Sequence, residues 1–151
     1  LPAKKMASQC YSWMFNGCSS LKVAPELPAT ELARNCYGGM FFNCKNLTTA
    51  PVLSATALVD YCYDQMFNGC TKLSSITILA PSDQISGTSF FYNSDSNWIS
   101  ETGTDASVTS RTLKVQDRDA YDALVTKGLP ANWKIGSNCT VLNKDGNAIT
   151  E

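Results

Sequence analysis

The most informative absence in this sequence is histidine, of which its 151 residues contain none. Without an imidazole there is no Ser-His-Asp or Cys-His nucleophilic machinery, no imidazole base and no mixed Cys/His zinc site. Carboxylate or lysine chemistry stays open to such a chain. We nevertheless expect neither an enzyme nor a bound cofactor or metal.

Charge and long apolar runs are scarce as well. Charged residues make up 17% of the chain and the net charge is −1, which gives no electrostatic footprint for DNA, RNA or an anionic membrane. The apolar runs are far shorter than the ~20 residues that a membrane-spanning helix needs. A signal-peptide pattern and an initiator Met are also absent, so we interpret the sequence as a mature or excised fragment.

What the sequence does contain is a repeat. Three ungapped copies of 26 residues begin at Leu1, Leu27 and Leu53, and they are called copy 1, copy 2 and copy 3 below. Eight columns are identical in all three copies: Leu1/Leu27/Leu53, Ala3/Ala29/Ala55, Cys10/Cys36/Cys62, Tyr11/Tyr37/Tyr63, Met14/Met40/Met66, Phe15/Phe41/Phe67, Cys18/Cys44/Cys70 and Leu21/Leu47/Leu73. All eight are apolar, amphipathic or small, which is typical of a stacked core.

Each copy combines a helical pattern with a short extended one. Apolar residues recur every four positions in the first part of copy 2, at Leu32, Cys36, Met40 and Cys44. This stripe predicts a helix, or a helix followed by a turn, and Gly38 and Gly39 should break or tighten the helix near Met40. Residues 47–50 then predict a brief strand that Pro51 stops, and residues 73–79 of copy 3 predict a better one. Stacked copies would place these strands in a parallel sheet along one wall.

The repeat unit also resembles a known family. Its Leu-Pro-Ala, Cys-Tyr, Met-Phe-x-x-Cys, Leu strand and Ala-Pro resemble the BspA-like leucine-rich repeats of surface proteins in gut and oral anaerobic bacteria. The resemblance covers residues 1–81 and implies an α/β repeat fold, a short leucine-rich-repeat solenoid. It further implies a module on the cell surface, or secreted, that binds a host or bacterial surface protein or a glycan in adhesion or recognition.

The repeated columns end near residue 81 and a stretch rich in Ser, Thr, Asn, Asp and Gly follows. We therefore divide the chain into a repeat array, 1–81, and a C-terminal capping region, 82–151. The cap should be mixed α+β and should cover the open end of the array. Its Ser/Thr-rich first part, 82–110, predicts short strands and turns. The rest predicts strands at 111–116, 133–135 and 139–142, a short helix between Asp117 and Gly128, and a hairpin turn at 143–146.

Seven cysteines allow two interpretations. Six of them occupy two columns of three and Cys139 stands apart, so stacked copies could form a ladder of disulfides. An odd total and columns of three count against complete pairing, and free cysteine is often buried. We therefore favour buried free thiols. The lack of a C-x-x-C motif and of an activating imidazole counts against a metal site and a catalytic thiol.

Four polar or aromatic clusters are open to a functional interpretation and to a plainer one. Asp117, Asp119 and Asp122 suit acid-base catalysis, or else charges at a helix start. Two stretches carry oxygen-bearing side chains at alternate positions, which suits either a calcium loop or a simple turn. They are Asn93, Asp95 and Asn97, and Asn143, Asp145 and Asn147. Phe91, Tyr92 and Trp98 suit stacking on a sugar, or else packing in the cap. We favour the plainer interpretation in each case.

The strand wall is the first place to look for a partner, because side chains there alternate between core and solvent. With the repeated Leu inward, the outward candidates are Val23, Thr49, Ser75 and Thr77. Our leading hypothesis is a monomeric, non-enzymatic recognition module that uses these positions. A structural stalk or spacer segment is the second hypothesis, and a carboxylate-based glycosidase is the third.

Overall fold

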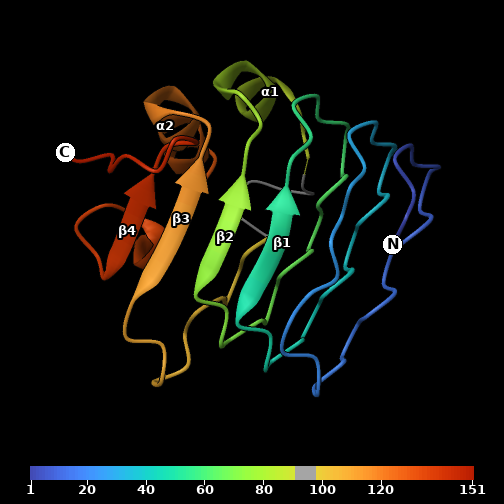
Figure 1. The fold of residues 1–151 in the computed structure, drawn as a ribbon, viewed down its shortest axis with the longest axis horizontal. Coiled ribbons are helices and arrows are strands. Elements are labelled where there is room, and N and C mark those ends of the chain that lie inside the picture. Colours follow the sequence, from blue (N-terminus) through green and yellow to red (C-terminus); the bar gives the residue numbers. More distant parts are fainter. Residues whose placement is uncertain (91–97) are drawn as a thin grey trace.

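The protein is an α/β fold built on one parallel sheet, in a computed structural model that describes residues 1–90 and 98–151. Four strands lie in the order β1-β2-β3-β4 and span Thr49–Leu53, Ser75–Ile78, Arg111–Val115 and Cys139–Leu142. The helices are α1 (Ser82–Gly87), α2 (Arg118–Thr126) and the short 3-10 helix η1 (Ala131–Trp133). Helices α1 and α2 lie together beyond the carboxyl ends of the strands (Figure 1).

Three of the strands follow the alternation in the sequence. Ile76 and Ile78 of β2 point into the core, and they pair in register with the equally buried Leu113 and Val115 of β3. The strands predicted at 73–79, 111–116 and 139–142 are therefore confirmed as β2, β3 and β4. The sheet runs without a break across residue 81, since β3 and β4 continue the parallel pairing begun by β1 and β2.

The prediction that Pro51 stops the first strand is wrong. Strand β1 continues through Pro51 to Leu53, and its register against β2 shifts between Thr49 and Val52. Ala50 and Pro51 both point inward while Val52 points outward. A bulge of this kind accommodates a residue that cannot donate a ladder hydrogen bond.

The helical segment predicted in each copy is also wrong. Residues 35–43 of copy 2 form consecutive turns, and the matching residues of copies 1 and 3 do the same. The backbone enters the left-handed region at every fourth residue, as at Asn35, Gly39 and Asn43. Such residues end a right-handed helix. The spacing of four therefore comes from tandem turns rather than from helical turns.

Hydrogen bonds between copies replace those of the expected helix. Alternate N–H groups of one copy donate to carbonyls 25 residues later in the next copy, as Trp13 donates to Gly38 (2.8 Å) and Gly39 to Asp64 (2.7 Å). The intervening N–H groups close the turns within a copy, as Met14 donates to the carbonyl of Tyr11. Every backbone donor along the turns of copies 1 and 2 is thus used, about half of them to join neighbouring copies.

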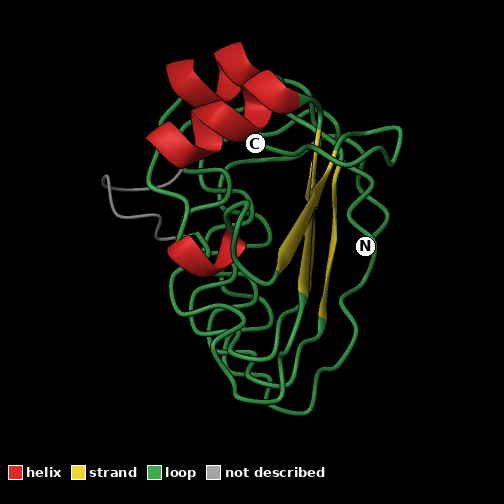
Figure 2. Ribbon diagram, turned by 90° about the vertical axis from the view of Figure 1, so that its left-hand side faces the viewer, coloured by secondary structure: helices red, strands yellow, loops and turns green. Residues whose placement is uncertain are grey.

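The repeated side chains stack in the same order as the copies. Tyr11, Tyr37 and Tyr63 stack with ring centroids 6.1 and 6.2 Å apart. Phe15, Phe41 and Phe67 do the same at 5.6 and 5.7 Å. Figure 2 shows the result, in which the sheet forms one wall, the turns form the opposite wall and the core lies between them.

The C-terminal part closes the copy 3 side of this stack. Phe90 meets Tyr63 edge-on at 6.4 Å, and Trp98 meets Phe90 edge-on at 5.9 Å, so the parallel stacking of rings ends there. The helix predicted after Asp117 is confirmed as α2, and the predicted hairpin turn leads into an antiparallel bridge between Leu142 and Ala148.

Two predictions in this part are wrong. Residues 131–133 form η1 where a strand over 133–135 was expected, because Trp133 turns into the core and its indole N–H donates to Thr102 Oγ1 at 2.9 Å. Residues 82–87 form α1 where only strands and turns were expected. The division of the chain at residue 81 stays a prediction.

Candidate functional site

The predicted binding positions lie on what we call the strand wall, the outward face of β1–β4 and of residues 21–28 beside β1. Val23 forms a parallel bridge with Thr49, and Thr49 pairs with Ser75. These three candidates therefore share one rung across the wall. Thr77 lies one rung further along, paired with Val52.

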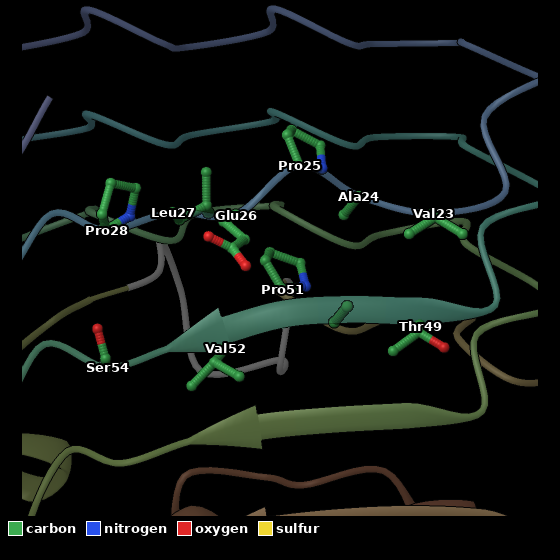
Figure 3. Close-up of a pocket in the computed structure, with 11 residues that line it drawn as sticks. Val23, Ala24, Pro25, Glu26, Leu27, Pro28, Thr49, Pro51, Val52 and Ser54 are labelled. Atoms are coloured by element: carbon green, nitrogen blue, oxygen red, sulfur yellow. The ribbon is translucent and has the colours of Figure 1, made fainter. Parts of the chain in front are cut away.

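A pocket of about 390 Å³ opens on this wall between copies 1 and 2. Residues 23–28, where copy 1 passes into copy 2, form one side of it, and residues 49–52 and 54, where copy 2 passes into copy 3, form the other (Figure 3). It brings together two of the four predicted positions, Val23 and Thr49, and does not include Ser75 and Thr77. Its size is in the range of about 300–1,000 Å³ usual for ligand pockets.

Two prolines in one repeat column explain why the pocket forms here. Pro25 and Pro51 occupy equivalent positions in copies 1 and 2, where copy 3 has Thr77. Proline has no N–H to donate to a sheet ladder. Beyond the bridge between Val23 and Thr49, no described residue of 24–28 bridges to 50–54. The two backbones therefore separate at the prolines, whereas β2 and β3 stay paired in register through Thr77.

The lining of the pocket is mostly apolar and its rim carries exposed valines. Only four large apolar side chains are exposed among the described residues, and two of them are Val23 (71%) and Val52 (52%) on this rim. Leu27 and Ala50 form part of the buried floor, and Glu26 is the one charged residue of the lining. Such a site offers apolar contact area and one negative charge.

Sequence reasoning missed Val52, Pro25 and Glu26 as parts of this site. Val52 has the position of an inward residue if β1 alternates strictly from Thr49, and only the bulge at Ala50 and Pro51 turns it outward. The Ala-Pro pair, present in copies 1 and 2 and missing from copy 3, was the signal that could have indicated it.

The aspartates at 117, 119 and 122 do not assemble into an acid-base pair. Asp117 caps α2 and accepts a hydrogen bond from the N–H of Ala120 at 2.9 Å. Asp122 pairs with Arg118 at 2.9 Å on the exposed surface of the same helix. The interpretation of these residues as charges at a helix start is confirmed for Asp117 and Asp119, which lie at the N-cap and in the first turn.

The calcium-like stretch at residues 143–147, which includes the predicted turn at 143–146, is closed by hydrogen bonds among its own residues. Asn143 Oδ1 accepts hydrogen bonds from the N–H groups of Asp145 (3.0 Å) and Asn147 (2.9 Å), and Asp145 pairs with Lys144. Across residues 1–90 and 98–151, no three His, Cys, Asp or Glu side chains converge as metal ligands would. The second calcium-like stretch, Asn93, Asp95 and Asn97, lies outside the described residues.

The aromatic cluster proposed for sugar stacking is described only in part. Trp98 is buried in the core and packs edge-on against Phe90, so packing rather than sugar stacking is the correct interpretation for this residue. Phe91 and Tyr92 lie outside the described residues.

All seven cysteines are free thiols, and their exposure differs between copies. Cys36, Cys44, Cys62 and Cys70 are buried, whereas Cys10 and Cys18 of copy 1 are exposed, so burial was wrongly expected for these two. Burial raises the pKa of Cys36 and Cys44 to about 11 and that of Cys70 to about 12. Thiols of such high pKa stay protonated at neutral pH and are weak nucleophiles.

Comparisons with protein-family models, with curated proteins and with solved structures find no significant match. The BspA-like resemblance and the cell-surface or secreted localisation that it implies therefore stay predictions. Among residues 1–90 and 98–151, the structure contains no helix with the length and apolar character needed to cross a membrane.

Proposed function

We propose that this chain is a non-enzymatic recognition module that binds a partner protein on its strand wall. The observation that carries this proposal is that two exposed valines, Val23 and Val52, lie on the rim of one apolar pocket. An exposed apolar pair beside a preformed hollow favours binding over a purely structural role. A partner segment laid across the wall would insert an apolar side chain between the two valines.

The chemistry of the pocket favours a protein partner over a glycan. Three prolines, two valines, two alanines and Leu27 line it, and hydroxyl groups come only from Thr49 and Ser54. A sugar needs many hydrogen-bond partners or an aromatic platform, and this lining offers few of the first and none of the second. The Glu26 carboxylate favours a basic residue next to the inserted apolar side chain.

We further infer that the stacked copies form a short leucine-rich-repeat solenoid with a C-terminal cap. Hydrogen bonds that recur at the same positions between successive copies, and the stacked Tyr and Phe columns, support this interpretation of the fold. With the BspA-like resemblance, it supports a protein on the surface of a bacterial cell, or secreted from it, that acts in adhesion or recognition.

The test is a binding screen in which the intact chain is offered immobilised matrix proteins and a glycan array. Val23→Asp and Val52→Asp are the test variants, because both side chains are exposed and their replacement leaves the core intact. Thr140→Asp is the matched control, since Thr140 is exposed on the same wall but lies on β4. We expect a bound protein to lose about tenfold or more in affinity with each valine variant, as burying one valine contributes about 1.5 kcal/mol.

Three results would contradict the proposal. Equal binding by all variants would move the recognition surface away from the pocket. Binding of glycans alone would contradict the proposal that the partner is a protein. A chain that binds none of the probes would favour the stalk or spacer hypothesis, in which the stack only sets a distance between other segments.

A further inference from the structure

The outer face of copy 1 has the residues of an internal interface, but no other described residue of the chain covers it. We call this the open face; Figure 1 shows it at the N-terminal end of the stack, with no described segment beyond it. Met14 is 46% exposed there, whereas Met40 and Met66 of the same column are fully buried. Cys10 is likewise exposed, whereas Cys36 and Cys62 are buried. The same side chains are thus core in copies 2 and 3 and surface in copy 1.

The open face also carries backbone carbonyl groups at the positions that accept hydrogen bonds in the interface between copies 1 and 2. In copy 2, the carbonyls of Arg34, Cys36, Gly38, Met40 and Phe42 accept hydrogen bonds from copy 1, with N–O distances of 2.8–3.1 Å. The equivalent carbonyls of copy 1 belong to Ser8, Cys10, Ser12, Met14 and Asn16, and none of them accepts a hydrogen bond from any described residue. Five acceptors with the spacing of an interface therefore face outward.

The column Cys18/Cys44/Cys70 also indicates a missing neighbour, because its thiols donate hydrogen bonds to the preceding copy. Cys44 Sγ donates to the carbonyl of Phe15 in copy 1, and Cys70 Sγ donates to that of Phe41 in copy 2, both at 3.0 Å. Cys18 is the copy 1 member of this column and is exposed, with no such acceptor among the described residues. Its acceptor would be the Phe carbonyl of a unit stacked in front of copy 1.

We propose that the open face seats one further unit of the same build, stacked in front of copy 1 and running parallel to it. The copy 1–copy 2 and copy 2–copy 3 interfaces supply the argument, because each covers the same columns with a unit that donates alternate N–H groups. This inference does not depend on the strand-wall pocket. It adds a second interaction surface, directed at a repeat unit rather than at a binding partner.

The direction of the hydrogen bonds excludes a second copy of this chain as the occupant. Two open faces brought together would set the five carbonyls of one against those of the other, and acceptors cannot pair with acceptors. The opposite end of the stack cannot serve either, since the edge-on rings of Phe90 and Trp98 and strands β3 and β4 follow copy 3. Only a chain segment with free N–H groups at alternate residues fits.

The geometry also specifies the chemistry of the occupant. It needs Tyr, Met and Phe in the stacking columns so that their rings and thioether cover Tyr11, Phe15 and Met14. It needs glycine, asparagine or another residue tolerant of the left-handed region at every fourth position, as at Gly39 and Asn43 of copy 2. A helix would not fit, because its N–H groups are consumed internally.

The experiment adds a unit of known sequence to the intact chain. Residues 27–52 are duplicated in front of Leu1, which recreates the natural junction between Val52 and Leu53 as Val-Leu. The rate at which each cysteine reacts with a small thiol reagent is then read by peptide mass spectrometry. We expect Cys10 and Cys18 to react at least about tenfold more slowly than in the chain without the added unit, because local opening must then precede reaction. The two thiols of the added unit should become the fast ones.

The matched control is the same extension with aspartate at its positions equivalent to Met40 and Phe41. This unit cannot stack, so Cys10 and Cys18 should react as fast as in the unextended chain. Cys36 and Cys44 report that the rest of the stack stays folded, since both are buried. Unchanged rates at Cys10 and Cys18 in the stacking version, with Cys36 and Cys44 still protected, would overturn the proposal. So would an unextended chain that sediments as a dimer with Cys10 and Cys18 already protected, because a second copy would then occupy the face.

Discussion

The indole of Trp13 lies against the backbone of Gly39, the residue at the same position of the next copy. A β-carbon on Gly39 would be 2.4 Å from Cε3 of this ring, a distance at which one of the two groups must move. Gly39 also has φ +60°, in the left-handed region that glycine adopts without strain. Trp13 completes the contact with Phe42, whose ring centroid is 5.4 Å away. The missing β-carbon of Gly39 and its left-handed φ therefore both contribute to the contact between copies 1 and 2.

Gly39→Ala and Gly17→Ala separate these two properties. Gly17 has φ +69°, and a β-carbon added to it would meet no atom within 4 Å, so alanine there adds strain alone, about 1 kcal/mol. We expect Gly39→Ala to cost at least about 1 kcal/mol more in the free energy of unfolding, since it also displaces the indole. Urea unfolding measures the costs, and acrylamide quenching reports on Trp13, because Trp98 and Trp133 are buried. Equal costs for the two alanines would show that the indole moves aside freely.

Thr102 is the one buried polar residue in the described part of the chain, and it joins Ile99 to Trp133 of η1. Its hydroxyl donates to the carbonyl of Ile99 at 2.5 Å and accepts from the Trp133 indole N–H at 2.9 Å. Thr102→Val should lower the free energy of unfolding by about 1–3 kcal/mol, because it leaves a buried N–H without an acceptor. Urea unfolding again gives the measurement.

Thr104→Val is the control for that substitution. The Thr104 side chain is exposed and donates only to the carbonyl of Glu101 at 3.2 Å. We expect a change within about 0.5 kcal/mol there. If the two valines cost the same, the buried hydrogen bond contributes nothing beyond the change of side chain.

Asp117 and Asp119 offer a test of the capping role assigned to the acidic cluster. Asp117→Ala removes the acceptor of the Ala120 N–H at the start of α2 and should cost about 1 kcal/mol. Asp119→Ala keeps the cap and removes only a charge in the first turn, worth about 0.5 kcal/mol. Thermal unfolding followed by circular dichroism ranks the two variants. A larger loss for Asp119→Ala would contradict the assignment of the cap.

The buried thiols make stability depend on alkaline pH. Burial raises the pKa of Cys36 and Cys44 from about 9 to about 11, and that of Cys70 to about 12. Above pH 9 the unfolded chain loses these protons while the folded chain keeps them, so the free energy of unfolding falls as pH rises. It should be at its full value below about pH 9 and decrease up to about pH 11–12. Burial raises the pKa of Tyr37 and Tyr63 as well, which adds to the decrease in the same direction.

Urea unfolding in steps from about pH 8 to about pH 11 measures this decrease, and Cys44→Ala supplies the control. That variant is less stable at every pH because it leaves a cavity, but its stability should fall less steeply above about pH 9. An unchanged slope would show that Cys44 does not titrate differently in the two states.

Local patterns predicted the elements that depend on neighbours close in sequence. Strands β2, β3 and β4 follow an alternation of apolar residues such as Ile76 and Ile78, and α2 follows Asp117 and an amphipathic stretch. The columns that fill the core were also predicted, since all eight recur in three copies. Only in copy 1 are members of these columns exposed, such as Cys10 and Cys18, because no described copy stacks in front of them.

The candidate site was predicted only in part, because its shape depends on how residues 24–28 separate from β1. Val23 and Thr49 were identified from alternation, and the structure places both on the pocket. Val52 was not predicted, because a bulge at Ala50 and Pro51 turns the later side chains of β1 to the face opposite to the one that strict alternation gives. Alternation alone cannot locate a bulge, although a proline indicates where one is needed.

The sequence by itself determined that three equivalent units stack and which side chains lie between them. Only the tertiary structure decided that the stripe at Cys36, Met40 and Cys44 belongs to tandem turns rather than to a helix. Both backbones bring every fourth side chain to the same side, so the spacing does not distinguish them. They differ in where the N–H groups donate. A helix satisfies them four residues away, whereas here alternate ones reach carbonyls 25 residues away in the next copy. That choice exists only once the copies are stacked.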